Sequence, residues 1–390
     1  MPTTFSLPPT IITGAGASEK VGEQAKRLGA TNALIVTDPG IVKIGYADQT
    51  AKNLHNAGIA TSIFSDVTPD PTLQNVTDGL NQYRAESCDL IVSIGGGSAI
   101  DCGKGIAMKL TNDGEFADYM GVDKIPNPSA PLIAIPSTAG TGSEVSKVTV
   151  ITDTDRNIKM MLSSACLLAS VALVDPLLSL TTPPHLTAAV GVDALTHAIE
   201  AYVSKRSQPI TDALALEAIR LISGSLRQAW ADGENISART DMMLGASIAG
   251  MAFSNSSVAL VHGMSRPIGA YFHIHHGLSN AVLLFDVMEF SVVGAPKRFA
   301  DIAQAMGEPI DGLSPMKQAD AAISAVERLV NDIQMPRLGE IGIDKEKFEQ
   351  VIDQMAADAI ASGSPANNPR QASTEEIVAL YRKCFSSRNT

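Results

Sequence analysis

Several features that mark other protein classes are missing from this chain of 390 residues. Its four cysteines (Cys88, Cys102, Cys166 and Cys384) include no Cys-x-x-Cys pair, which argues against a disulfide framework and against zinc held by thiolates. Dispersed, reduced thiols instead favour a cytoplasmic protein. The first residues also lack the basic start and continuous apolar region of a signal peptide.

Positive charge is scarce. The sequence has 29 Lys and Arg against 41 Asp and Glu, a formal net charge of −12, and no basic stripe. Because binding to phosphate backbones needs clustered Lys and Arg, nucleic acid is not expected as a partner. The longest run without acidic or basic residues, Met242–Ser265, contains Ser254, Asn255 and His262 and is too polar to span a membrane. We therefore expect no membrane partner.

The usual nucleotide-binding fingerprints are absent, since neither GxGxxG nor a Walker A sequence occurs. The chain does contain an apolar strand pattern, Leu90–Ile94, that leads into Gly95-Gly96-Gly97-Ser98 and a helical pattern over Ala99–Leu110. Glycines allow close approach to a pyrophosphate, and free amides at a helix N-terminus attract anions. The alternative is a tight strand-to-helix turn without a ligand.

The order of strand and helix patterns predicts two domains. Apolar strands alternate with amphipathic helices up to about residue 180, which indicates a parallel sheet covered on both faces. Helical patterns then dominate, so we predict an α/β domain over residues 1–180 and an all-helical domain over 181–390. The predicted strands are Thr31–Thr37, Ile59–Phe64, Leu90–Ile94 and Pro131–Ile135. A further predicted helix is capped by Thr182 and carries Asp193. Besides this helix and Ala99–Leu110, the predicted helices are Ser18–Leu28, Asp48–Ala57, Thr72–Glu86 (Thr72 as N-cap), Thr211–Ser223, Ala238–Phe253, Pro296–Met306, Met316–Ile333, Lys345–Ala361 and Thr374–Phe385.

One carboxylate and several histidines have spacings that suit a metal site. Asp193 and His197 lie four residues apart in a helical pattern, so they share one face about one turn apart. His262 and His276 follow in the chain. Imidazole suits zinc and iron, and a carboxylate suits iron. The alternative is a hydrogen bond along the helix together with scattered core histidines.

Two further segments end strands, where cofactors bind in such sheets. Asp38 could accept a hydrogen bond from a ribose 2′-hydroxyl and would repel a 2′-phosphate, which favours NAD over NADP. It could equally be the first residue of an Asp-Pro-Gly turn. Pro136–Ser146 is a loop rich in glycine and hydroxyl groups that could contact phosphate or ribose.

The chain resembles the iron-containing (group III) alcohol dehydrogenases in motifs that follow in order over nearly its whole length. The most specific pair is GVDALTHAIEAY together with HGLSNA. The full series is GGGSAID (Gly95–Asp101), IPSTAGTGSEVS (Ile135–Ser146), VDP (Val174–Pro176), TAAVGVDALTHAIEAYVS (Thr187–Ser204), VHGM (Val261–Met264), HGLSNA (His276–Ala281) and NNPR (Asn367–Arg370).

The resemblance implies a dinucleotide-binding α/β domain followed by an all-α metal-binding domain, in a dehydroquinate synthase-like fold. It also implies NAD(H)- or NADP(H)-dependent interconversion of alcohols and aldehydes or ketones, aided by a divalent metal, Fe²⁺ or alternatively Zn²⁺, in a homodimer or larger homo-oligomer. Because Asp38 favours NAD, we expect NAD-dependent interconversion of a small primary alcohol or diol and its aldehyde. The implied metal ligands are Asp193, His197, His262 and His276. The implied cofactor contacts are Asp38, Gly95, Gly96, Gly97, Ser98, Asp101, Thr138, Thr141, Ser143 and Lys159, with Asp101 also a candidate catalytic residue.

Other functions remain open from the sequence. A polyol (glycerol-type) dehydrogenase or a maleylacetate reductase on the same fold is the nearest alternative. A metallohydrolase with a phosphate-binding loop is an alternative from another class. The glycine turn and Asp38 weigh against the hydrolase, as does the absence of a second carboxylate-rich cluster.

The proton-transfer residue departs from the family pattern. Many members have a histidine four residues after the first ligand of the second histidine segment, where this chain has Arg266, which stays protonated at working pH. This chain also has His273 and His275 just before the last ligand. We hypothesise that His273 or His275 relays the proton, with His273 as the first candidate, and that Arg266 pairs with an acid or orients the cofactor.

Replacing His273 by alanine is expected to lower turnover and to change its pH profile, because loss of a relay leaves the proton to slower routes. Steady-state kinetics across a pH series measure both quantities. Turnover and a pH profile equal to those of the wild type would remove His273 from the relay.

Overall fold

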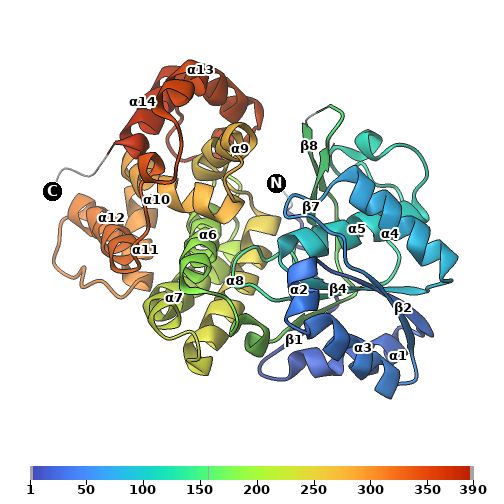
Figure 1. Cartoon of the computed structure of the whole chain (residues 1–390). Helices are drawn as coiled ribbons and strands as arrows, with labels where there is room; N and C mark the ends of the chain where they lie inside the picture. The colour runs from blue at the N-terminus through green and yellow to red at the C-terminus, as the bar shows by residue number, and fades with distance from the viewer. Residues whose placement is uncertain (1–2, 157, 387–390) are drawn as a thin grey trace. The chain divides into compact units, whose positions relative to one another are not determined.

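The structure is a computed structural model that describes residues 3–156 and 158–386. The chain divides into two compact units, the first ending at Thr181 and the second starting at Thr182. The first unit is α/β and the second is helical (Figure 1).

A parallel sheet is the framework of the first unit, as the apolar strand patterns predict. The described residues form six strands with every neighbouring pair parallel. Three neighbouring strands are in register, with Ile35 opposite Val92 and Val92 opposite Ile133. In spatial order the strands are β1 (Thr10–Thr13), β9 (Val171–Val174), β6 (Leu132–Pro136), β4 (Leu90–Gly95), β2 (Asn32–Val36) and β3 (Ala60–Phe64).

Helices cover both faces of this sheet, because successive strand residues point to opposite sides. Leu34 and Val36 of β2 belong to one core cluster, whereas Ala33 and Ile35 belong to another. The first cluster packs with α4 and α5, and the second with α1 and α3. The helices are α1 (Val21–Arg27), α2 (Pro39–Lys43), α3 (Tyr46–Asn56), α4 (Leu73–Ala85) and α5 (Gly97–Thr111), with short 3₁₀ turns at Ala17–Lys20, Phe116–Tyr119, Ala165–Leu167 and Pro176–Ser179. Thr72 caps α4 as predicted.

A second, small sheet is a feature that the strand patterns missed. β7 (Val148–Asp153) and β8 (Ile158–Ser163) pair antiparallel, and β5 (Gly121–Val122) joins the edge of β8. β7 alternates buried and half-buried residues, which is the pattern of a strand with one solvated face. Strands β1 and β9 of the main sheet were also not predicted.

The second unit consists of helices packed around α6, whose residues from Thr187 to Val203 are all buried. The helices predicted from residue 211 onward are present. α9 and α10 were not predicted as helices. The elements are α6 (Pro184–Val203), α7 (Pro209–Ala231), α8 (Ile236–Asn255), α9 (Leu260–Phe272), α10 (His276–Ser291), α11 (Pro296–Ala305), α12 (Pro315–Asp332), α13 (Lys345–Ala361) and α14 (Thr374–Phe385), with 3₁₀ turns at Val292–Gly294, Leu338–Glu340 and Ser364–Asn367.

The predicted N-cap of α6 is wrong. The capping position is Pro183, and no side chain caps the helix there. Thr182 contributes its carbonyl oxygen, which accepts hydrogen bonds from the Thr187 hydroxyl (3.3 Å) and from the Arg239 guanidinium (3.0 Å). Two consecutive prolines move the N-cap one residue past the threonine, so the helix starts at Pro184, because proline suits the first helical turn.

One helical stretch of the described chain, His276–Gly294, is long and apolar enough to cross a membrane. A bent pair formed by α8 and α9 passes the same test as a broken span. Of the first stretch, 67% is buried inside the protein.

Two helical glycines differ in the space around them. A Cβ on Gly103 in α5 would lie 1.8 Å from the Ser93 Oγ, whereas a Cβ on Gly224 in α7 would meet no atom within 4 Å. We expect Gly103→Ala to destabilise the protein by about 1–3 kcal/mol or more through overpacking. Gly224→Ala should stabilise it by about 0.5–1 kcal/mol, because alanine favours the helix.

Urea unfolding of both variants beside the wild type measures these differences. Ser93→Ala should partly rescue Gly103→Ala, since it removes the nearest atom. Equal stability of Gly103→Ala and Gly224→Ala would contradict the packing described for α5.

Candidate functional site

Helix α6 places the first two candidate ligands. Asp193 and His197 lie one turn apart on the same face, and their relative exposures are 2% and 5%. The His197 ring stacks on Phe253 of α8, with centroids 4.4 Å apart. An acidic and an imidazole side chain are thus held in the interior of the helical unit, where a polar group must find a partner.

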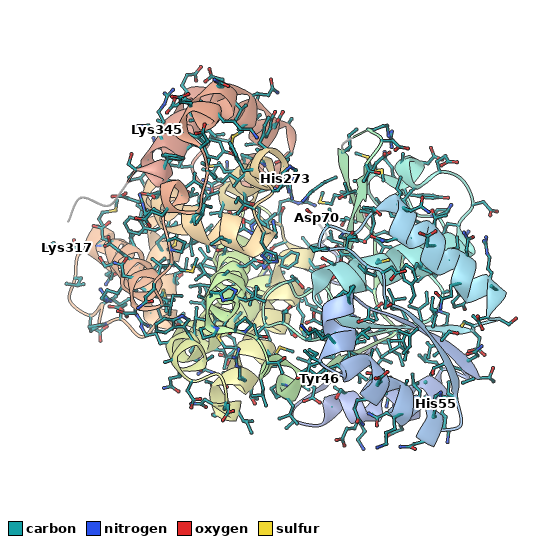
Figure 2. All side chains as sticks on the ribbon, in the orientation of Figure 1. Tyr46, His55, Asp70, His273, Lys317 and Lys345 are labelled. Carbon is teal, nitrogen blue, oxygen red and sulfur yellow. The ribbon has the colours of Figure 1, made fainter. Side chains whose placement is uncertain are left out.

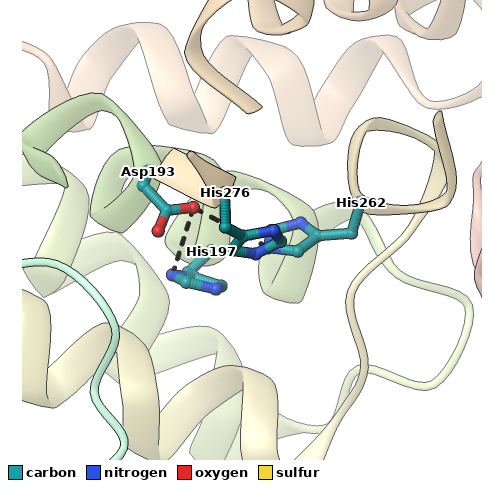
Figure 3. A group of neighbouring side chains, drawn as sticks. All are labelled: Asp193, His197, His262 and His276. Carbon is teal, nitrogen blue, oxygen red and sulfur yellow. Dashed lines mark ion pairs between the residues drawn. The ribbon is translucent and has the colours of Figure 1, made fainter. Parts of the chain in front are cut away.

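Helices α9 and α10 bring two more histidines to the same point. His262 lies in the first turn of α9, and His276 is the first residue of α10. Each of the four residues offers one ligand atom, and these atoms all lie within 4.8 Å of one another. The Asp193 Oδ1 is 4.0 Å from the His197 Nδ1 and 3.9 Å from the His262 Nε2, as the dashed lines in Figure 3 mark.

The protonation states suit a divalent cation. Burial lowers the pKa of His262 well below its ordinary value, and the neighbouring imidazoles lower it further, so the ring is neutral. Burial works to raise the pKa of Asp193, but the three imidazoles and the Asn280 amide outweigh it and keep the carboxylate ionised. The buried His197 Nδ1 has no hydrogen-bond partner among residues 3–156 and 158–386. A neutral His262 ring, an ionised Asp193 carboxylate and the unpartnered His197 nitrogen fit a bound metal.

Asn280 is a member of this cluster that we did not predict. It lies four residues after His276 on α10 and is fully buried. Its Nδ2 donates to the Asp193 Oδ1 at 2.6 Å and lies 3.1 Å from the Nε2 atoms of both His262 and His276. The HGLSNA motif contained this residue, and its helical spacing from His276 was the signal that could have found it.

Glu200 is the second unpredicted member. Its Oε2 lies 2.6 Å from the Nδ1 of His262, and it is 2% exposed. Burial raises the pKa of Glu200 to about 7, although three backbone N–H groups act in the opposite direction. The sequence signal was its position three residues after His197 on α6.

The glycine turn has the form that the sequence predicts. β4 ends at Gly95, whose φ of +147° favours glycine, and α5 begins at Gly97 after Gly96 as N-cap. A Cβ on Gly97 would lie 2.9 Å from the Thr141 Cγ2, and one on Gly96 would lie 3.8 Å from the Thr138 Oγ1. The two threonines of the second loop therefore lie beside the glycine turn.

Asp38 is a turn residue that caps α2, and its carboxylate also lies next to the glycine turn. Its Oδ1 caps α2 by accepting from the N–H groups of Gly40 (2.8 Å) and Ile41 (3.1 Å). Its Oδ2 would lie 3.2 Å from a Cβ on Gly95. The residue is thus both a turn residue and a carboxylate next to the glycine turn.

Asp101 and Ser143 are held together with a buried lysine that we did not predict. The Ser143 Oγ donates to the Asp101 Oδ1 at 2.5 Å, and the Val150 N–H donates to the Oδ2 at 3.0 Å. The fully buried Lys104 donates to the Ser146 oxygens and to the Val148 carbonyl at 2.8–3.1 Å. Burial raises the pKa of Asp101 and lowers that of Lys104 to about 8. Lys104 follows Asp101 by three residues on α5, which was the available signal.

Ser98 and Lys159 are connected to another loop. The Ser98 hydroxyl donates to the Pro69 carbonyl oxygen. Lys159 is an exposed residue of β8, and its Nζ pairs at 2.8 Å with the Oδ1 of Asp70, the residue labelled in Figure 2. Both side chains therefore contact the Pro69–Asp70 segment, and Ser98 also belongs to the glycine turn.

The proton-relay candidates are exposed. His273 ends α9 in a left-handed conformation (φ +56°) and is labelled in Figure 2, and His275 directly precedes α10. Arg266, one turn after His262, donates to the Ser364 Oγ at 3.0 Å. Burial lowers the pKa of Arg266, whereas the charge of Glu200 raises it, which identifies Glu200 as a nearby acid.

Comparison with known proteins matches both units of the chain. Residues 8–176 match the family described as iron-containing alcohol dehydrogenase, and residues 187–385 match its C-terminal domain. The chain is 44% identical over 384 residues to 1,3-propanediol dehydrogenase of Klebsiella pneumoniae, covering 98% of each chain. It is 40% identical to the NAD-dependent methanol dehydrogenase of Bacillus methanolicus, covering 98% of this chain and all of that one.

A crystal structure of 1,3-propanediol oxidoreductase superposes with a TM-score of 0.96 at 43% identity, covering 99% of this chain and 100% of that one. The chain therefore belongs to the iron-containing alcohol dehydrogenase family. It is an oxidoreductase that uses NAD and a divalent metal to interconvert alcohols and carbonyl compounds. The metallohydrolase alternative is wrong.

Proposed function

We propose that this enzyme oxidises small primary alcohols, including 1,3-diols, to aldehydes with NAD, and that it catalyses the reverse reaction. The observation that carries the proposal is the convergence of Asp193, His197, His262 and His276 in the helical unit, where all but His276 are buried. The high identity to a 1,3-propanediol dehydrogenase supports the choice of substrate class. We assign metal binding to the helical unit from Thr182 and dinucleotide binding to the unit ending at Thr181.

The metal site has its chemistry prepared in advance. Asp193 supplies the negative charge, and the Asn280 amide keeps its Oδ1 in place. When bound, the metal would polarise the substrate oxygen as a Lewis acid, and NAD would accept the hydride. Phe253, stacked on His197, gives one side of the cluster an apolar surface that suits a small alkyl chain.

The cofactor site combines backbone and side-chain groups. The amides at Gly95, Gly96 and Gly97 are offered to the pyrophosphate, since the N-terminus of α5 attracts an anion. Thr138 and Thr141 supply hydroxyls beside them. Ser98 and Lys159 reach the same region through the Pro69–Asp70 segment.

Asp101 is the proposed anchor of the nicotinamide end. Ser143 and the Val150 N–H fix both of its oxygens, and Lys104 fixes the loop that carries Ser143. A carboxylate held at two points can orient a cofactor amide without reorganising. Lys104 acts in this arrangement as a positioning residue.

The direct test uses protein purified without chelator and loaded with Fe²⁺ or Zn²⁺ under anaerobic conditions. We expect NADH absorbance to rise with 1,3-propanediol and with short primary alcohols, and to rise less with glycerol. Treatment with a chelator should abolish the signal, and metal addition should restore it. Absence of turnover with every alcohol by metal-loaded protein would overturn the proposal, and preference for glycerol or for a carboxylated substrate would favour the related enzymes.

The Asp38 carboxylate is expected to select NAD over NADP. Asp38→Ser keeps a residue that can cap α2 but removes the charge that repels a 2′-phosphate. The ratio of kcat/KM for NADP to that for NAD should rise at least about tenfold, as expected if about 1.4 kcal/mol of discrimination is lost. Asp66→Ser, an exposed carboxylate of the same unit, serves as the control and should leave the ratio unchanged. An unchanged ratio in Asp38→Ser would remove Asp38 from coenzyme selection.

The remaining assignments belong to the same proposal. We expect a cytoplasmic protein that forms a homodimer or larger homo-oligomer, as the family resemblance implies. The net charge of −12 weighs against a nucleic acid partner, and the burial of most of the long apolar helix weighs against a membrane partner. Light scattering coupled to gel filtration measures the oligomeric state.

A further inference from the structure

Glu200 occupies a special place on α6. It follows His197 by three residues and Asp193 by seven, so the three side chains share one face of the helix. All three are at most 5% exposed. One buried helix face therefore carries two proposed metal ligands and a carboxylate that is not among the ligands.

The Glu200 carboxylate contacts the ring of a third ligand. Its Oε2 is 2.6 Å from the Nδ1 of His262, while the Nε2 of that ring faces Asp193 at 3.9 Å. A carboxylate accepts hydrogen bonds, so this contact holds the proton on Nδ1 and leaves Nε2 with its lone pair toward the cluster. Carboxylates commonly orient metal-binding histidines through the second ring nitrogen.

The same carboxylate caps α9. Its Oε2 accepts from the backbone N–H of Ala259 (2.9 Å), and its Oε1 accepts from that of Val261 (2.6 Å). Alanine at the N-cap offers no side-chain acceptor, so these N–H groups depend on Glu200. The backbone of α9 and the ring of His262 are thus attached at one point to the helix that carries Asp193 and His197.

We infer that Glu200 is a positioning residue that holds the His262 ring, by its Nδ1 and by the start of α9, in the orientation that binds the metal. This inference rests on the proposed function of the four ligands. Metal affinity in the helical unit then depends on a residue that does not touch the metal.

Glu200→Gln is the discriminating variant, because glutamine keeps the shape but replaces one acceptor oxygen by a donor. Competition with a chromophoric chelator gives the dissociation constants of Zn²⁺ and Co²⁺. We expect Glu200→Gln to weaken metal binding about 10- to 100-fold. Asp286→Asn is the matched control, since Asp286 is a buried carboxylate of α10 that pairs with Arg337 at 2.9 Å, and its loss should lower stability without changing metal affinity.

Metal affinity of Glu200→Gln within twofold of wild type would overturn the inference, as would an equal loss in Asp286→Asn. If Glu200→Gln does not fold, ¹⁵N-histidine spectra of the zinc-loaded wild type decide, with His262 assigned by replacement. A proton on Nδ1 supports the inference and a proton on Nε2 overturns it. Wild-type protein that binds no metal would instead overturn the proposed function, so the two failures are distinguishable.

Discussion

A single buried carboxylate constrains the helical unit. Placing the charge of Asp193 in the interior costs several kcal/mol unless partners compensate it. The compensation comes from imidazoles on α6, α9 and α10 and from the Asn280 amide. These helices must approach closely, and a Cβ on Gly277 would lie only 3.3 Å from the Ala189 carbonyl oxygen of α6. Gly277 of the HGLSNA motif thus serves the packing that brings the ligands together.

The two units prepare for charge in opposite ways. The α/β unit offers backbone amides at a glycine turn, which attract an anion without any ionised side chain. The helical unit offers one carboxylate and three imidazole side chains, a ligand set that suits a cation. In the α/β unit, the buried Lys104 also fixes the loop that carries Ser143. The lowered pKa of Lys104 reflects the desolvation of its ammonium group.

The sequence predicted what depends on local pattern. Four apolar strands of the main sheet, most of the helices and the glycine turn follow from hydrophobic periodicity and from capping residues such as Thr72. β7 and β8 were missed because neither contains a continuous apolar run: Thr149 and Asp153 lie on the buried face of β7, and Lys159 interrupts β8. α9 contains Pro267, which is typical of a helix break, and α10 is buried on most sides and shows no clear amphipathic stripe.

The site itself was predicted through resemblance more than through spacing. Asp193 and His197 share a helix, but 65 residues or more separate His197 from His262 and His276, and no local rule brings them together. Glu200, Asn280 and Lys104 were not found because their roles are contacts made only after folding. The assignment of a relay to His273 stays a prediction.

The gathering of four ligands within one unit has a thermodynamic consequence. A metal that binds the native helical unit, but not its unfolded chain, adds RT ln(1 + [L]/Kd) to the stability of that unit alone, about 2.7 kcal/mol at a hundredfold excess over Kd. The α/β unit gains nothing from the same ion by this term, and NAD would act there instead. The concentrations of the metal and of the coenzyme would then determine the stabilities of different units of the same chain.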